Sequence, residues 1–214
     1  MSKTIIVAGL GRCGSTLAMQ MLYTSGHDTI GQWPDFECTE HHKNSVAAPS
    51  KWKSAGINKA FKMLEPNRYQ GTAIDDAYII FLTRDHRVQM LSQLRLLGIG
   101  LNELSRNERR KWIKSLQVDE QSSRKVLQKL VTKRPILELK FEDLVTSKDT
   151  VAKVAEFIGA CDSCAEAMKA PWIYRNNGKT VNGLLELFTS TDDFTAAMHE
   201  VRERSLTNCS CQAK

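Results

Sequence analysis

Residues that can bind an anion are concentrated in one short segment near the N-terminus, residues 9–16 (GLGRCGST). Its three glycines let a backbone approach a ligand closely, and Arg12 carries a permanent positive charge. Ser15 and Thr16 add hydroxyl groups that can donate hydrogen bonds. These residue types at this spacing predict a turn that binds phosphate.

The flanking residues predict a strand before this turn and a helix after it. Residues 5–8 (IIVA) are an apolar run typical of a buried strand, and residues 17–22 place apolar side chains on one side of a helix. Because the first N–H groups of a helix have no partner within the helix, such a strand-to-helix turn makes a cradle for an anion. We expect it at the carboxyl end of a sheet strand.

Three nucleotide-binding patterns overlap in this turn. Gly9, Gly11 and Gly14 match the dinucleotide pattern GxGxxG. The same segment nearly matches the triphosphate loop GxxxxGK[ST], but Ser15 stands where that loop has lysine, which weakens a P-loop kinase or ATP-hydrolysing interpretation. The third pattern, Arg-x-Gly-Ser-Thr-Leu at residues 12–17, resembles the 5′-phosphosulfate loop of sulfotransferases that use 3′-phosphoadenosine 5′-phosphosulfate (PAPS).

A second strand-turn-helix unit lies near the middle of the chain. Residues 78–83 (YIIFLT) are typical of a buried strand, Arg84 follows them, and Ser92 lies eight residues later in the next helix. This unit resembles the strand-R-D-P-R-D-x-x-x-S motif with which sulfotransferases bind the 3′-phosphate of PAPS, although His86 and Val88 replace its proline and second aspartate. Without the resemblance, Arg84 is a sheet-edge residue and Ser92 a helix-surface residue.

A third segment carries residues that are mainly architectural. Residues 135–141 predict a strand, and a helix after it ends at Gly159. The sequences FEDL at 141–144 and FIG at 157–159 resemble the family patterns [YF]-E-D-L and F-[IL]-G. With three motifs in order over residues 5–159, the chain resembles the PAPS-dependent sulfotransferase family.

The resemblance implies an α/β fold: one domain with a central parallel sheet flanked by helices, related to the P-loop nucleotide kinases. The residue pattern agrees, because four strand candidates alternate with helical segments. Two of those helices are expected at residues 108–116 and 121–131, and the domain is expected to cover residues 1–205, with a disordered tail at 206–214. The strand candidates are residues 4–8, 57–64, 78–83 and 135–141.

The reaction implied is transfer of a sulfuryl group from PAPS to a hydroxyl or amine acceptor, with release of 3′,5′-bisphosphoadenosine. By analogy with phosphoryl transfer, the protein would position groups and stabilise charge on the departing phosphate oxygen, and no metal is expected. Arg84 and Ser92 would bind the 3′-phosphate. The 5′-phosphate would be held by Arg12, Cys13, Gly14, Ser15, Thr16 and Leu17.

The resemblance implies that Arg12 is the catalytic cation that stabilises charge on the departing phosphate oxygen, and a second catalytic cation is expected from residues 57–64. Cytosolic family members carry a lysine in this strand and a catalytic histidine two residues later. Lys62 matches that lysine, but Leu64 stands at the histidine position, so the family's usual general base is missing. Lys62 is therefore either a catalytic cation or a solvated strand-edge residue.

Glu37 is the first candidate for the missing base. Residues 31–37 (GQWPDFE) resemble the Pro-x-x-Glu turn of some bacterial carbohydrate sulfotransferases, in which the glutamate is the base. His41 and His42 are the second candidates, because imidazole titrates in the useful range. The remaining candidates are Glu65, Asp35 or no side chain at all.

Two basic segments are further candidates for ligand contacts. Many sulfotransferases close a late basic loop over the 3′-phosphate, and Arg175 and Lys179, in an expected polar turn at 174–179, fit that role as well as that of an ordinary surface loop. The lysines around Trp52, within residues 43–59, are expected to border the acceptor pocket.

Composition bounds the class of protein. The chain has 214 residues, a net charge of +6 and no apolar run that approaches a membrane span. The first strand begins near Thr4, so we expect no signal peptide and a cytoplasmic location. The expected partner is a small-molecule or carbohydrate acceptor rather than a nucleic acid, and no oligomeric state is predicted.

The six cysteines are expected to be free thiols in a reducing compartment. Cys161-x-x-Cys164 and Cys209-x-Cys211 together have the number and spacing of four zinc ligands. Because the second pair lies in a polar tail, we do not expect a metal there.

A different class, the NADP-dependent hydroxyacid dehydrogenases, has a similar opening. GLGRCG followed by residues 26–31 (GHDTIG) resembles their first strand, glycine turn and second strand. Pro34 discourages a continuing central strand, and the Arg84–Ser92 pair would be left unexplained.

Overall fold

The computed structural model describes residues 3–71, 73–74, 76–131, 133–177 and 192–209. Four parallel strands form one sheet in the order β2-β1-β3-β4. The two central strands are almost wholly apolar because helices cover both of their faces. The strands are β1 (Thr4–Gly9), β2 (Ala60–Leu64), β3 (Ala77–Thr83) and β4 (Ile136–Lys140). The expected α/β class and all four strands are confirmed.

Helices precede or follow each strand. They are α1 (Ser15–Thr24), α2 (Thr39–Ala47), α3 (Pro49–Gly56), α4 (His86–Leu96), α5 (Arg106–Leu130), α6 (Phe141–Thr146), α7 (Lys148–Ile158), α8 (Asp162–Asn177) and α9 (Asp192–Asn208). Two short 3-10 turns, η1 (Pro66–Arg68) and η2 (Leu101–Glu103), lie between them. No helix within the described part of the chain has an apolar stretch that could cross a lipid bilayer.

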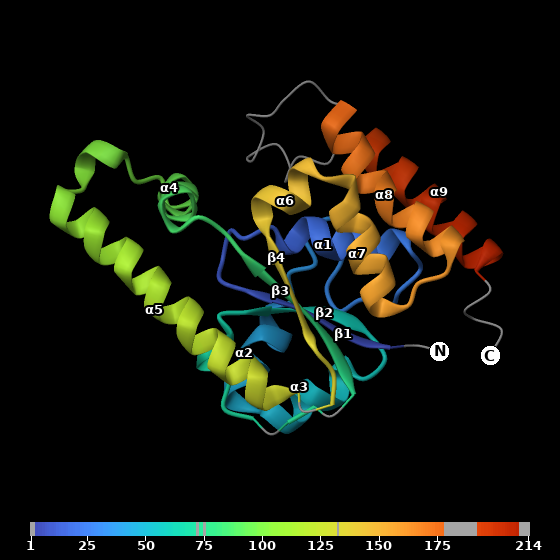
Figure 1. Ribbon diagram of the computed structural model, residues 1–214, viewed down its shortest axis with the longest axis horizontal. Helices are drawn as coiled ribbons and strands as arrows, with labels where there is room; N and C mark the ends of the chain where they lie inside the picture. The colour runs from blue at the N-terminus through green and yellow to red at the C-terminus, as the bar shows by residue number, and fades with distance from the viewer. Residues whose placement is uncertain (1–2, 72, 75, 132, 178–191, 210–214) are drawn as a thin grey trace.

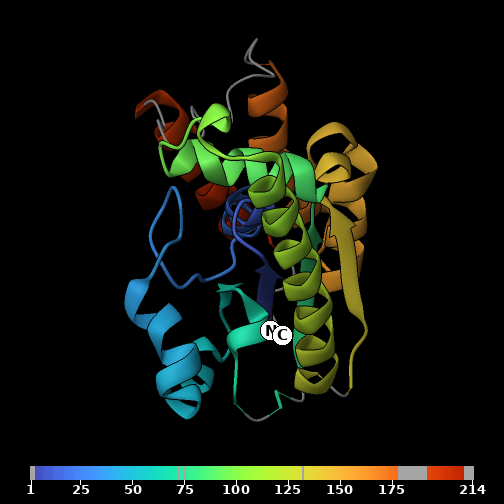
Figure 2. The same ribbon diagram turned by 90° about the vertical axis from the view of Figure 1, so that its left-hand side faces the viewer.

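The helices form a layer on each face of the sheet (Figure 1). Ile5 and Val7 of β1 pack against α1, α7 and α8, whereas Ile6 and Ala8 point to the opposite face and pack with α3 and α5. The helix α9 covers α8 and α1. Figure 2 shows α4 crossing the end of the sheet and α5 running along its side.

The expected pair of helices at 108–116 and 121–131 is one helix, α5. Residues 106–130 contain no glycine or proline, so nothing in the backbone interrupts it. A capping box fixes its start: the N–H of Glu108 donates to Ser105 Oγ, and the N–H of Ser105 donates to Glu108 Oε2.

The C-terminal third is more helical than expected. The polar turn predicted at 174–179 is wrong for its first four residues, because α8 continues through Asn177 despite Pro171. Met168 and Trp172, one helical turn apart, are both buried against the core, and this packing holds the helix together on either side of the proline. The last helix, α9, reaches Asn208, beyond the expected start of the tail.

The segment that a dehydrogenase would use as its second strand has a different structure. Within residues 26–31, Thr29 makes a single β-bridge to Ala60, and the neighbour of β1 in the sheet is β2, over fifty residues further along the chain than β1. The described residues that follow α1 therefore do not form the strand that a dinucleotide-binding fold requires there.

Candidate phosphate-binding site

The two predicted phosphate turns meet at the carboxyl ends of β1 and β3, which are neighbours in the sheet. Arg84 Nη1 donates a hydrogen bond to the carbonyl oxygen of Arg12 at 2.9 Å, and Arg12 Nε donates to Ser92 Oγ at 3.1 Å. β1 leads to α1 on one face of the sheet, whereas β3 leads through α4 to α5 on the other (Figure 1). Ligands of α/β proteins bind where neighbouring connections diverge in this way.

Two residues of the first turn have a positive φ. Gly14, the N-cap of α1, has φ of 94°, and Arg12 has φ of 72°, in a region that non-glycine residues seldom adopt. No side chain caps α1, and its first hydrogen bond runs from the N–H of Ala18 to the carbonyl of Gly14. The N–H groups at the start of α1 thus point out of the helix, as an anion cradle requires.

Arg84 is a buried cation beside this turn. Its side chain lies over the ring of Phe141 at 4.1 Å, and the residue is 6% exposed. Burial lowers the pKa of the guanidinium, an effect that nearby Glu142, 4.0 Å from Nε, opposes. Among the described residues, Nε has no hydrogen-bond partner. A buried charged donor without a partner is costly, and an anionic ligand would satisfy it.

Lys62 and Glu37 form an ion pair at the same edge of the sheet. Lys62 Nζ donates to Glu37 Oε1 at 2.7 Å and to Thr16 Oγ1, in the phosphate turn, at 3.0 Å. The Lys62 side chain is 5% exposed, so it is not a solvated strand-edge residue, whereas that of Glu37 is 51% exposed. The structure thus places the expected cation and the first candidate base together beside the turn.

His41 lies in the core rather than in solvent. Its ring stacks on Trp52 and meets Phe61 edge-on, with centroids 5.6 and 4.9 Å apart. Burial, with the nearby positive charges of His42 and Lys59, lowers the pKa of His41 to about 4. An imidazole with this pKa is a weak base, and its buried Nε2 has no hydrogen-bond partner among the described residues. His42 is exposed on α2.

The depressed pKa of His41 predicts a loss of stability in acid. Between about pH 6.5 and pH 4, His41 is protonated in the unfolded chain but stays neutral in the folded protein. The free energy of unfolding is therefore lower at pH 5 than at pH 7.5, by about 2 kcal/mol. We expect His41→Phe to remove this part of the dependence, measured by urea unfolding at pH 7.5 and 5.0. Equal acid sensitivity in the variant and the parent would contradict the assignment.

The remaining candidate bases and the basic residues predicted to contact a ligand lie in different parts of the structure. Asp35 accepts a hydrogen bond from the N–H of Glu37, and Glu65 pairs with Arg68 at 3.0 Å. The backbone of Arg175 is in the last turn of α8, but its side chain and all of Lys179 lie outside the described residues. Trp52 is fully buried and is a core residue.

The thiol of Cys13 points into the protein. The residue is buried, and burial raises the pKa of its thiol to about 12, so the sulfur is neutral at physiological pH. A buried, neutral thiol is a poor nucleophile, so Cys13 can contribute to a phosphate site only through its backbone.

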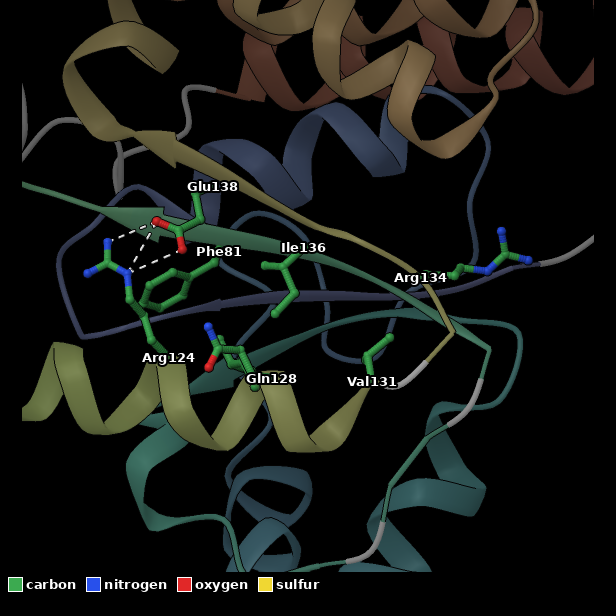
Figure 3. A pocket seen from close by; sticks show the side chains of 8 residues that line it. Phe81, Arg124, Gln128, Val131, Arg134, Ile136 and Glu138 are labelled. Carbon is green, nitrogen blue, oxygen red and sulfur yellow. Dashed lines mark hydrogen bonds and ion pairs between the residues drawn. The ribbon is translucent and has the colours of Figure 1, made fainter.

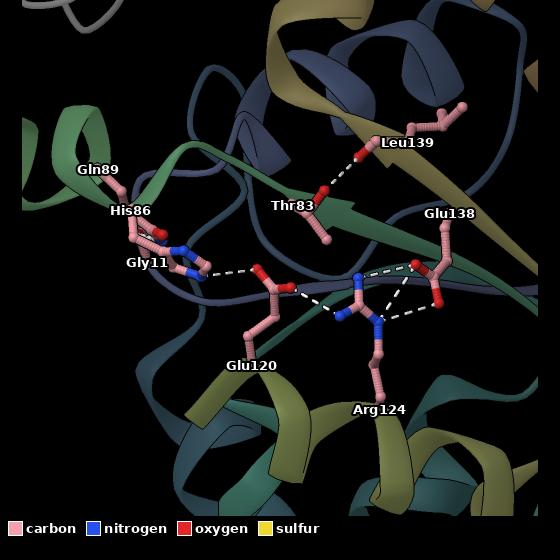
Figure 4. Close-up of polar contacts among 8 residues, drawn as sticks. All are labelled: Gly11, Thr83, His86, Gln89, Glu120, Arg124, Glu138 and Leu139. Carbon is pink, nitrogen blue, oxygen red and sulfur yellow. Dashed lines mark hydrogen bonds and ion pairs between the residues drawn. The ribbon is translucent and has the colours of Figure 1, made fainter. Parts of the chain in front are cut away.

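Two buried or half-buried glutamines at the site were not predicted. Gln89 Nε2 donates to the carbonyl of Gly11 at 2.8 Å (Figure 4), and Gln93, which accepts from the indole of Trp112, also approaches that carbonyl. Gln89, Ser92 and Gln93 are one helical turn or less apart and lie on one side of α4. This spacing in the sequence could have indicated that the two glutamines accompany Ser92. A cavity of about 400 Å³ between α4, α5 and η1 adjoins Gly11 and Gln93.

A chain of polar contacts joins α4, α5 and β4 beside the site (Figure 4). His86 Nε2 lies 3.1 Å from Glu120, Glu120 pairs with Arg124 at 2.7 Å, and Arg124 pairs with Glu138 of β4 at 2.9 Å. This network links the start of α4, which carries Ser92, to the sheet. His86, which replaces the proline of the motif, therefore has a structural contact of its own.

A second cavity, of about 320 Å³, lies between α5 and the edge strand β4 (Figure 3). Two of its lining residues are arginines, but both are neutralised within the protein: Arg124 by Glu138 and Arg134 by Asp76 at 2.6 Å. This cavity is therefore a poorer site for an anion than the turn beside Arg84.

In comparisons with known proteins, the chain matches solved structures only. No protein-family model matches the chain, and no curated protein matches it. Among solved structures, it is similar to retinol dehydratase in complex with androsterone and the inactive cofactor PAP, with 12% identity and a TM-score of 0.47, over 96% of this chain and 81% of that one. At this identity and TM-score the match carries no information about activity.

Proposed function

We propose that this protein is a PAPS-dependent sulfotransferase that acts on a hydroxyl or amine group of a small-molecule or carbohydrate acceptor. The observation that carries the proposal is the cluster of Arg12, Arg84 and Ser92, in which two motifs over seventy residues apart share hydrogen bonds. A single phosphate turn fits many nucleotides. A second buried cation on the neighbouring strand fits a ligand with two separate phosphate groups.

The residues present fit such a ligand. The backbone N–H groups at the start of α1 and the guanidinium of Arg12 would hold the 5′-phosphate, and Arg84 with Ser92 would hold the 3′-phosphate. The unpartnered Nε of Arg84 is the donor that most needs an anion. When bound, PAPS supplies an activated sulfuryl group for transfer.

Lys62 and Glu37 have separate tasks in this proposal. Lys62 Nζ, which donates to Thr16 Oγ1, would supply positive charge to the departing phosphate oxygen as negative charge grows on it. Lys62 donates a hydrogen bond to Glu37 Oε1. The Glu37 side chain is half exposed, so its carboxylate can accept the proton of an acceptor hydroxyl. The ion pair orients both groups.

Calorimetric titration with 3′,5′-bisphosphoadenosine, NADPH and ATP tests the proposed class. We expect bisphosphoadenosine to bind with a Kd in the micromolar range, roughly −8 kcal/mol, and the other two to bind much more weakly. Tighter binding of NADPH would assign the site to a dinucleotide, and tighter binding of ATP would assign it to a triphosphate. Either result would overturn the sulfotransferase assignment.

Glu37→Gln tests the proposed base. In a mass-spectrometric screen for acceptors that gain one sulfuryl group from PAPS, we expect the variant to form product at least about tenfold more slowly, at unchanged affinity for bisphosphoadenosine. Glu40→Gln, which neutralises an exposed glutamate paired with Lys51, is the matched control and should retain its rate. Equal rates in both variants would remove Glu37 from the mechanism.

A further inference from the structure

Three cysteines at the start of α8 and the end of α9 lie close together, outside the phosphate site. Cys161 lies directly before α8, Cys164 is in its first turn, and Cys209 follows the last residue of α9. Their sulfur atoms lie 3.3 Å (161–164), 3.7 Å (161–209) and 3.1 Å (164–209) apart. The sequence predicted that Cys209 lies within a disordered tail at 206–214, but its sulfur contacts the two cysteines at the start of α8.

This geometry suits a tetrahedral metal ion. A zinc–sulfur bond of about 2.3 Å places two thiolates of a tetrahedral site about 3.8 Å apart. The separation between Cys161 and Cys209 matches this value, and the other two separations are somewhat shorter. The C-x-x-C spacing of the first two cysteines is a common arrangement for zinc ligands. The separations exceed the roughly 2.05 Å of a disulfide bond, and all three sulfurs lie within 4.8 Å of one another.

The surroundings hold the thiols in place. Ser163 Oγ lies 3.2 Å from Cys161 Sγ and donates to the carbonyl of Asn208, which ties the start of α8 to the end of α9. Ser205 Oγ lies 3.9 Å from Cys164 Sγ. Contacts of this kind orient metal ligands.

We infer that Cys161, Cys164 and Cys209 bind a zinc ion that fixes α9 to α8. Cys164 is buried, whereas Cys161 and Cys209 are partly exposed. Zinc binds cysteines as thiolates, so its binding releases protons. Cys211, the fourth cysteine of the sequence pattern, lies outside the described residues.

The site links to the rest of the protein through α9. Arg202 of α9 donates to the carbonyls of Tyr23 and His27, at the end of the helix that begins at the phosphate turn. A zinc ion would therefore stabilise the packing of α9 without contacting the turn itself. Its presence does not depend on the sulfotransferase proposal, and zinc binding and nucleotide binding can fail separately.

Metal analysis of the purified full chain, kept reduced with a phosphine, tests this inference. We expect one zinc per chain by mass spectrometry, a tetrahedral-thiolate absorption spectrum after replacement by Co²⁺, and a Tm lower by at least about 5 °C after treatment with a chelator. Cys209→Ser should lose the metal, whereas Cys38→Ser, at a cysteine outside the cluster, should retain it.

Three results would overturn the zinc site. They are a chain without metal after expression with added zinc, a Co²⁺ spectrum without thiolate bands, and thiol counting that finds two of the three cysteines joined as a disulfide in the native protein. The chelator and Co²⁺ measurements use the unaltered chain, so the test holds even if Cys209→Ser does not fold.

Discussion

Replacing Arg84 with alanine is expected to weaken the binding of 3′,5′-bisphosphoadenosine by about a hundredfold. The guanidinium is buried, and its Nε has no hydrogen-bond partner among the described residues, so a phosphate would gain charge-assisted hydrogen bonds in a site shielded from water. Such bonds contribute roughly 1.5–3 kcal/mol each. Two of them amount to about 3 kcal/mol, and each 1.4 kcal/mol is a factor of ten.

The control for this variant is Arg87→Ala. Arg87 lies three residues after Arg84, carries the same charge and is exposed, so its removal reports only the general electrostatic attraction of the ligand. We expect less than about a threefold change for it, by calorimetry at the same ionic strength. Because Arg84 also donates to the Arg12 carbonyl, circular dichroism should show that both variants are folded. Similar affinities in the two variants would leave Arg84 outside the ligand site.

The parts of the site that the sequence predicted are those fixed by local rules. The strand, glycine turn and helix over residues 4–24 follow from apolar runs and turn residues within a few positions of one another. The meeting of Arg12 with Arg84 and Ser92 follows from topology, because the carboxyl ends of parallel strands share one edge of the sheet.

Features that depend on tertiary packing escaped prediction. The burial of Lys62 and of His41 depends on which helices cover β2, and a residue pattern does not specify that. The proximity of Cys209 to Cys161 requires α9 to return along α8, a contact between residues 48 positions apart. The continuation of α8 past Pro171 is set by the burial of its neighbours, which outweighs the local cost of proline.

Gly14→Ala is expected to lower the free energy of unfolding by about 3 kcal/mol. An alanine at φ of 94° is strained by roughly 1–2 kcal/mol. In addition, its Cβ would lie 2.6 Å from Cδ2 of Phe141, so this ring, over which Arg84 lies, would have to move. Overpacking of this kind costs a further 1–3 kcal/mol or so.

Gly11→Ala separates the fold of the turn from its function. Gly11 has no positive φ, and the nearest atom to an added Cβ is Gln93 Nε2 at 3.9 Å, so urea unfolding should change by less than about 0.5 kcal/mol. If phosphate binds where Gly11 adjoins the open cavity, the added methyl group should nevertheless weaken bisphosphoadenosine binding. A Gly14 variant as stable as the Gly11 variant would mean that the turn does not have the described backbone. A Gly11 variant with unchanged affinity would instead place the phosphate elsewhere along the start of α1.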